Sequence, residues 1–130
     1  MEVTKESVPA GRTALVLTMQ YELLTGATGL LGSQLLRQAE AAGRPLAVLV
    51  RAKSGRSAQQ RVSGPSIKVL QGDLTRPGLG LTGEDEQWVA EHCRRVVHCA
   101  ASLQFQVHQS NSEPYRSNVD GLRHLLGLLL

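Results

Sequence analysis

The segment TGATGLLG, Thr25 to Gly32, joins an apolar stretch to a segment with helical periodicity. Its three glycines suit a strand-to-helix turn that binds a dinucleotide. Gly26 permits a sharp turn out of the strand, Gly29 lets the backbone approach a pyrophosphate at the helix N-terminus, and Gly32 allows close packing of helix on strand. Glycine-rich turns are also common at strand ends, so the elements around the turn decide between these interpretations.

The flanking segments predict a strand, a helix and a second strand. The first strand begins near Ala14 and ends at Thr25. The helix that follows the turn stops at Gly43 and Pro45. Leu46–Val50 is a continuous apolar run, which is typical of an interior parallel strand covered on both faces. The apolar stripe of the helix is Leu31, Leu35, Ala39 and Ala42.

The next part of the chain repeats this alternation. Residues 52–66 predict a loop that holds a short helix around Ala58 to Val62. Ile67 to Leu70 is a mixed apolar run that suits a strand at the sheet edge. Thr82 followed by Asp85 resembles a capping pair, which predicts the start of another helix.

The last part predicts one more strand and one more helix. The capped helix runs to about Cys93, and Arg95 to Ala100 is the fourth strand. Pro114 lies near the start of the final helix. One apolar face of that helix carries Val119, Leu122, Leu126 and Leu129. Leu125, Leu128 and Leu130 broaden this face.

This order of elements predicts an α/β fold with a Rossmann-type, doubly wound parallel sheet of about four strands in the order 3-2-1-4. The βαβ context favours the dinucleotide interpretation of the glycine turn. A four-strand sheet leaves the fourth strand as an open edge and the terminal leucines uncovered. We therefore expect a loose lead at residues 1–12, followed at 13–130 by an incomplete N-terminal portion of a dinucleotide-binding domain.

Composition excludes several classes of protein. The 130 residues are 42% hydrophobic and 19% charged, which is ordinary for a soluble domain and excludes disorder or a fibrous repeat. The apolar runs are too short for a membrane span, and Glu2 and Glu6 argue against a secretory signal. Cys93 and Cys99 lack the spacing of metal ligands, so we expect no metal site. We expect both to be buried thiols, and we expect the protein to be cytoplasmic, where cysteines stay reduced.

Basic residues follow the second strand and bear on the choice of cofactor. Dinucleotide sites for NAD place an acid about 20 residues beyond the glycines, whereas a basic residue there accommodates the 2′-phosphate of NADP. Arg51 occupies this position, so NADP is favoured. The alternative is a set of solvated loop charges, and we favour that for Lys53 and Arg56. Nucleic-acid binding is disfavoured because the basic stretch, residues 44–68, lacks stacking aromatics.

Several longer motifs resemble one family. They are LLTGATGLLG, LVRA with Arg61 ten residues after Arg51, GDLTRPGLGL, VVHCAA and NVDG. From about Tyr21 onward, the chain resembles the extended short-chain dehydrogenase/reductases, and within them the thioester reductase and fatty acyl-CoA reductase group. The GDLTRPGLGL segment is the most specific to that group.

The resemblance implies roles for individual residues. Those implied at the cofactor, in addition to Gly26, Gly29 and Gly32, are Thr28, Leu30 and Leu31 at the pyrophosphate, Arg51 and Arg61 at the 2′-phosphate, Asp73 and Leu74 at the adenine, and Ala100 and Ala101 beneath the nicotinamide ribose. Asn118 matches an asparagine that supports the active-site hydrogen-bond network. At Leu122 the chain departs from the usual threonine of the family.

Structural interpretations stand beside these roles. Asp73 is a candidate turn residue, and Asn118 is a candidate for local hydrogen bonding within its helix. We interpret His98 as a satisfied core histidine rather than a catalytic one. Tyr115 is expected to be a packing residue.

The Tyr-x-x-x-Lys pair of this superfamily is missing, because the fourth residue after Tyr21 is Thr25 and the fourth after Tyr115 is Val119. No lysine occurs after Lys68. We therefore expect the chain to bind NADP(H) but to be inactive alone. The first hypothesis is the cofactor-binding portion of an enzyme that reduces an acyl thioester, on coenzyme A or a carrier protein, to an aldehyde. The alternatives are an NADP-dependent epimerase, dehydratase or ketone reductase, and a non-catalytic dinucleotide-binding sensor.

Overall fold

A parallel sheet of four strands forms the centre of the molecule in the computed structural model, which describes residues 19–103 and 112–130. The strand order is β3-β2-β1-β4, as predicted from the sequence. All three pairings are parallel, so the carboxyl ends of the strands meet at one edge. The strands are β1 (Tyr21–Thr25), β2 (Leu46–Val50), β3 (Ile67–Gln71) and β4 (Cys93–His98).

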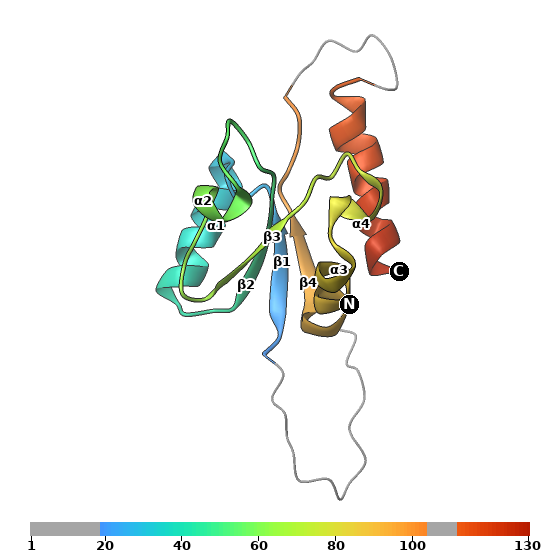
Figure 1. The fold of residues 1–130 in the computed structure, drawn as a ribbon. Helices are drawn as coiled ribbons and strands as arrows, with labels where there is room; N and C mark the ends of the chain where they lie inside the picture. The colour runs from blue at the N-terminus through green and yellow to red at the C-terminus, as the bar shows by residue number, and fades with distance from the viewer. Residues whose placement is uncertain (1–18, 104–111) are drawn as a thin grey trace, which may run out of the picture.

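Helices cover both faces of the sheet, with α1 and α2 on one side and α3 and α4 on the other (Figure 1). This arrangement confirms the doubly wound α/β fold. The α-helices are α1 (Leu30–Ala41), α2 (Ala58–Arg61), α3 (Gly83–His92) and α4 (Gly121–Leu129). A short 3₁₀ segment, η1 (Pro77–Gly80), precedes α3, and a π-helical segment, η2 (Arg116–Asp120), leads into α4. Among the described residues, no helix combines the length and apolar character needed to cross a bilayer.

Strand β2 explains how the core is divided. All five of its residues are buried, and it pairs with a strand on each side. Val48 packs with α1 and α2 in one apolar cluster, whereas Ala47 and Leu49 pack with α3 and α4 in a second cluster. The unbroken apolar run therefore predicted an interior strand correctly, because both faces of such a strand are covered.

Local signals set the ends of two helices. The N-cap of α3 is Thr82, whose side chain accepts a hydrogen bond from the Asp85 backbone N–H, as the sequence predicts. Three acidic residues lie in the first turn of α3, where the helix dipole favours negative charge. Helix α1 ends just before Gly43, which has a positive φ of 63°.

Strand β4 begins two residues earlier than predicted, at Cys93 instead of Arg95. The reason is that α3 passes into the strand without a loop, since Cys93 is both the C-cap of α3 and the partner of Tyr21. Cys93, in this edge strand, and Cys99, just beyond it, are half-buried, so the expectation of buried thiols is met only in part. Burial raises the pKa of the Cys93 thiol to about 11, and the charge of Arg94 acts in the opposite direction.

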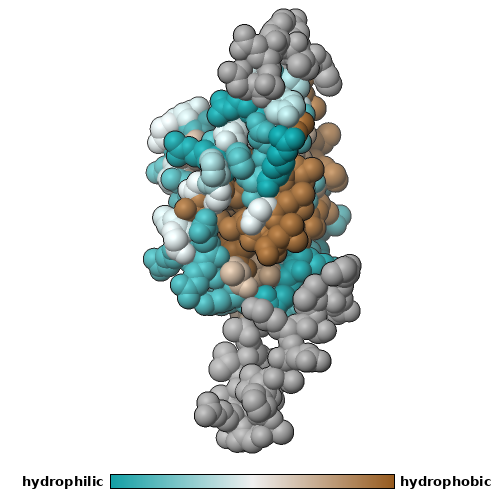
Figure 2. Space-filling view, turned by 90° about the vertical axis from the view of Figure 1, so that its right-hand side faces the viewer, coloured by the Kyte–Doolittle hydropathy of each residue, from teal (hydrophilic) through white to brown (hydrophobic). Residues whose placement is uncertain are grey.

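Only part of the broad apolar face predicted for α4 is buried. Leu125 is 2% exposed and packs on the sheet, whereas Leu122, Leu126 and Leu129 are between 40% and 46% exposed. Two contacts with Leu74 hold α4 in this orientation: the His124 Nδ1–H donates to the Leu74 carbonyl at 2.7 Å, and a Cβ on Gly121 would lie 3.2 Å from the Leu74 Cβ. Figure 2 shows the apolar surface on the side of the molecule that carries α4.

Candidate functional site

A cavity of about 220 Å³ lies at the carboxyl edge of the sheet. Open parallel sheets bind ligands at this edge, where the strand order reverses on either side of the first strand. The wall combines the glycine turn with residues at or just beyond the ends of all four strands. The lining residues are Thr25, Gly26, Ala27, Thr28, Gly29, Leu49, Val50, Arg51, Arg61, Gly72, Asp73, Leu74, Thr75, Cys99, Ala100, Ala101 and Ser117.

The glycine turn is shaped by close backbone contacts. Gly26 has φ 77°, and a Cβ there would lie 2.6 Å from the backbone N of Ala100 and the carbonyl carbon of Cys99. A Cβ on Gly32 would overlap the carbonyl of Gly26, so α1 packs on the turn through backbone alone. The Gly29 N–H donates to the Gly26 carbonyl at 3.0 Å and closes the turn. These contacts give two of the three glycines the packing tasks expected of them.

Most residues predicted at the cofactor meet in this cavity. The predicted residues that line it are Gly26, Thr28, Gly29, Arg51, Arg61, Asp73, Leu74, Ala100 and Ala101. Leu30, Leu31 and Gly32 lie outside the lining. Leu30 and Leu31 are 88% and 62% exposed at the start of α1. Gly32 instead supports the turn from beneath.

Arg51 and Arg61 form the basic end of the cavity. The Arg61 Nη1–H donates to the Arg51 carbonyl at 2.7 Å, which brings α2 against the end of β2. Lys53 and Arg56 do not line the cavity and pair with each other through their backbones. Their position outside the cavity agrees with the interpretation of both residues as loop charges.

Asp73 supplies the carboxylate of the cavity wall. Its Oδ1 accepts hydrogen bonds from the backbone N–H and the hydroxyl of Thr75, at 2.8 and 2.7 Å. Burial acts to raise the pKa of Asp73, but these hydrogen bonds and the charges of Arg51 and Arg76 outweigh it and hold the pKa below its ordinary value. Asp73 is thus both a turn residue and an ionised group of the cavity wall.

The sequence did not identify Thr25 and Ser117 as cavity residues. Thr25 is fully buried, and its Oγ1 lies 2.6 Å from His98 Nδ1 and 3.3 Å from the Ala100 backbone N. His98 is exposed because β4 is an edge strand, so the prediction of a core histidine was wrong. A buried threonine at the end of β1 gives no local signal of a partner 73 residues away.

Asn118 connects the segment before α4 to the loop after β4. Its side-chain Oδ1 accepts from the Ser102 backbone N–H at 2.7 Å, and its Nδ2 donates to the Ser102 carbonyl at 3.1 Å. The alternative of local hydrogen bonding within the helix is therefore wrong. By holding Ser102, Asn118 supports the strand end that carries Ala100 and Ala101.

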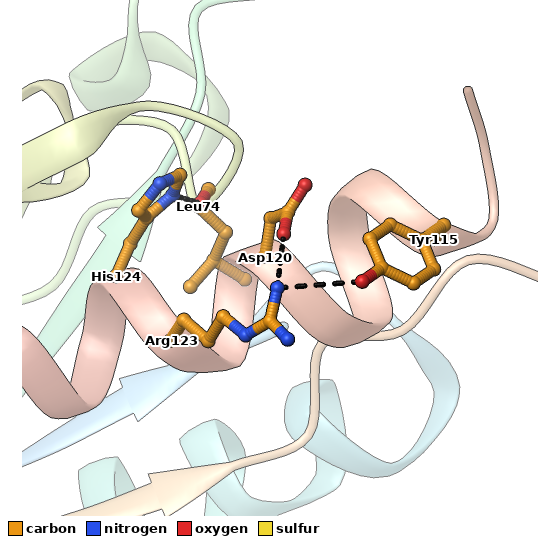
Figure 3. A network of polar contacts seen from close by, with 5 residues as sticks. All are labelled: Leu74, Tyr115, Asp120, Arg123 and His124. Atoms are coloured by element: carbon orange, nitrogen blue, oxygen red, sulfur yellow. Dashed lines mark hydrogen bonds and ion pairs between the residues drawn. The ribbon is translucent and has the colours of Figure 1, made fainter. Parts of the chain in front are cut away.

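A polar network on α4 involves Tyr115 (Figure 3). The Arg123 Nη1–H donates to the Tyr115 hydroxyl at 3.3 Å and to Asp120 Oδ1 at 3.1 Å. Tyr115 thus has a partner on the helix that follows it. On the same helix, His124 contacts Leu74, a cavity residue. Among the described residues, no group of three or more His, Cys, Asp or Glu side chains could hold a metal ion.

A model of an NAD-binding family, described as "Male sterility protein", matches residues 24–130. Fatty acyl-CoA reductase 1 of Pongo abelii is 32% identical over 125 residues, which cover 80% of this chain and 24% of the relative. The chain therefore spans about a quarter of that relative.

Solved structures give the same picture. The reductase domain of a non-ribosomal peptide synthetase from Mycobacterium tuberculosis is 30% identical, with a TM-score of 0.66 over 86% of this chain and 30% of that one. The terminal R domain from the myxalamid PKS-NRPS biosynthetic pathway is 28% identical, with a TM-score of 0.68 over 85% of this chain and 31% of that one.

Proposed function

The chain belongs to the NAD-binding family described as "Male sterility protein", and from this premise we propose that its cavity binds NADP(H). The carrying observation is that one cavity joins the glycine turn at the start of α1 to Arg51, Arg61 and Asp73. Backbone N–H groups at a helix N-terminus suit a pyrophosphate, and guanidinium groups suit a further phosphate. Residues 13–130 would then form part of a dinucleotide-binding domain.

The proposal assigns each part of the dinucleotide to residues of the cavity wall. The pyrophosphate would lie against Gly26–Gly29, and the adenine beside Asp73 and Leu74. The ribose of the nicotinamide would lie over Ala100 and Ala101, just beyond the end of β4. All of these residues line the cavity.

The preference for NADP over NAD is expected to depend on Arg51. We expect the unmodified chain to bind NADPH at least about tenfold more tightly than NADH, since a charge-assisted hydrogen bond contributes about 1.5–3 kcal/mol. The Arg51→Ala variant should lose most of this difference while it keeps its affinity for NADH. Titration calorimetry with both dinucleotides measures the effect.

A matched control is Lys53→Ala, which removes a basic residue two positions away that does not line the cavity. This variant should keep the preference for NADPH. Equal affinities of the unmodified chain for the two dinucleotides would refute the assignment of NADP.

We further propose that this cofactor serves the reduction of an acyl thioester, on coenzyme A or a carrier protein, to an aldehyde. Support comes from the relatives, which are a fatty acyl-CoA reductase and two biosynthetic reductase domains. When bound, NADPH supplies a hydride. The residues of this chain hold and orient the cofactor: the glycine turn fixes the pyrophosphate, and Asn118 holds the strand end beneath the nicotinamide ribose.

The sequence favours a second function for the chain taken by itself, namely dinucleotide binding without turnover. Its 130 residues contain no Tyr-x-x-x-Lys pair for proton transfer. We therefore expect the chain to bind NADPH but not to oxidise it when an acyl-CoA is added. Absorbance of the reduced nicotinamide, followed with calorimetry on the same sample, tests both parts. Oxidation that depends on acyl-CoA would assign catalysis to residues within this chain.

A further inference from the structure

The Thr25 hydroxyl connects an exposed histidine to the floor of the cavity. Thr25 is 0% exposed, and it is the one polar side chain among the described residues that is classed as buried. Its Oγ1 lies between His98 Nδ1 at 2.6 Å and the Ala100 backbone N at 3.3 Å. Thr25 and Ala100 both line the cavity, and His98 does not.

Hydrogen-bond donors determine how these three groups can be arranged. The Ala100 N–H only donates, so Oγ1 accepts from it. The hydroxyl proton is then available to His98, whose Nδ1 accepts when the ring is neutral with its proton on Nε2. In this state the threonine uses its one donor and one of its acceptor positions, so its buried hydroxyl is satisfied.

Protonation of His98 removes this arrangement. Both nitrogens of the charged ring are donors, so Nδ1 can no longer accept from the Thr25 hydroxyl. The hydroxyl must turn away to accept from Nδ1, and its own proton then loses its partner in a buried site. An unsatisfied buried donor is costly, so the pair either separates or weakens its hold on Ala100.

The shape of the cavity depends on the hydrogen bond between the Ala100 N–H and the Thr25 hydroxyl. The Cys99 N–H donates to the Thr25 carbonyl at 3.1 Å, which is the last ladder bond between β1 and β4. Beyond it, the hydroxyl of Thr25 fixes the Ala100 N–H, which faces Gly26 at close range. A displacement of Ala100 therefore changes both the glycine turn and the opposite wall of the cavity.

We propose that Thr25 is a positioning residue for the dinucleotide and that the protonation state of His98 sets the direction of its hydroxyl, so that binding weakens in acid. The inference rests on the proposed dinucleotide binding. Partial desolvation of the His98 ring, whose Nδ1 faces the buried Thr25 although the residue as a whole is exposed, lowers the pKa of His98, and this direction agrees with a site that favours the neutral ring. Affinity is then complete above the ordinary pKa of histidine, and it declines as the pH falls through the lowered value.

Among the described residues, no charged group on a neighbouring element forms a hydrogen bond or ion pair with His98 or Thr25. Alternation along β1 places Thr25 on the sheet face of Tyr21 and Leu23, which α3 and α4 cover. On β1 and β4, Glu22 and Arg95 pair with each other at 3.7 Å. The other titratable groups of the packed elements are Tyr21 on β1, Glu84, Asp85, Glu86, Glu91 and His92 on α3, Cys93 and Arg94 on β4, and Arg116, Asp120, Arg123 and His124 on η2 and α4. Within the described part of the chain, the ring of His98 bonds only to Thr25.

The test is the affinity of the chain for NAD⁺ as a function of pH, because the 2′-phosphate of NADP⁺ itself titrates near pH 6. Between pH 7.5 and 5.5 we expect the Kd of the unmodified chain to rise about three- to tenfold. The His98→Asn variant keeps an acceptor near the Nδ1 position but does not titrate, so its Kd should change less than about twofold over the same range. Far-ultraviolet circular dichroism at each pH verifies that the chain is folded.

Two threonine variants separate positioning from general stability. Thr25→Val removes the hydroxyl at nearly constant volume and should weaken binding at pH 7.5 and abolish its pH dependence. Thr25→Ser keeps the hydroxyl and should restore both. His92→Asn, a histidine change at the last residue of α3, should behave as the unmodified chain.

The outcomes distinguish this inference from the proposed function. Binding that is equally pH-dependent in the unmodified and His98→Asn chains, or pH-independent in both, overturns the role of His98 and leaves dinucleotide binding intact. Normal affinity and pH dependence in Thr25→Val overturn the role of the hydroxyl. Absence of binding to NAD⁺ and NADP⁺ at every pH refutes the proposed function and this inference together.

Discussion

Replacing Gly26 with alanine is expected to lower the free energy of unfolding by about 3 kcal/mol and to abolish measurable dinucleotide binding. A residue with a side chain loses about 1–2 kcal/mol in the left-handed conformation that Gly26 adopts at φ 77°. The added Cβ would also lie 2.6 Å from backbone atoms of Cys99 and Ala100, so β1 and β4 must move apart. Urea unfolding and calorimetry measure the two effects.

Gly43 provides a matched control for this prediction. It has a similar positive φ of 63°, but a Cβ there would meet nothing within 4 Å. Gly43→Ala should therefore cost only the conformational term, about 1–2 kcal/mol, and should leave dinucleotide affinity unchanged. If the two variants lose the same stability, the contact between the glycine turn and β4 is not the cause.

The second large effect is expected at Leu125, the leucine of α4 that faces the sheet. Leu125→Ala should lower the free energy of unfolding by about 3 kcal/mol, because the side chain is 2% exposed and its removal leaves a cavity in the cluster around Leu23 and Leu49. Chemical denaturation followed by the fluorescence of Trp88 measures the change.

Leu126 is the control for the orientation of α4. This neighbouring leucine is 46% exposed, so Leu126→Ala should cost less than about 1 kcal/mol. The predicted apolar face, which carried Leu126 and was only broadened by Leu125, gives the opposite order. A larger loss at Leu126 than at Leu125 would show that the helix is rotated toward the face first inferred from the sequence.

The sheet could be predicted because its signals are local. Leu46–Val50 is apolar throughout and proved to be the interior strand, and the Thr82–Asp85 pair marked the start of α3. The exact orientation of α4 could not be predicted, because several leucines share one broad apolar face and the sequence does not say which of them meets the sheet. Contacts of Gly121 and His124 with Leu74, 47 and 50 positions earlier, accompany the observed orientation.

Some residues of the candidate site could likewise be predicted from the sequence, and others could not. Arg51 was predicted from its spacing after the glycines, and Asp73 and Ala100 from the family resemblance. All three line the cavity because each lies at or just beyond the end of a strand, where a parallel sheet collects its ligand-binding groups. The family resemblance places Leu30 and Leu31 at the pyrophosphate, and in the first turn of α1 their side chains are 88% and 62% exposed. The partnership of Thr25 with His98 depends on the pairing of β1 with β4, which a local pattern does not encode.

The cavity wall draws on the carboxyl end of every strand and on Ser117 before α4. All four strands, which separate when the protein unfolds, therefore contribute to a single ligand site. Under the proposed function, each tenfold rise in free dinucleotide above its Kd adds about 1.4 kcal/mol to the folded state. Because proteases cut mainly the opened chain, the lifetime of this protein among them would follow the supply of its own cofactor.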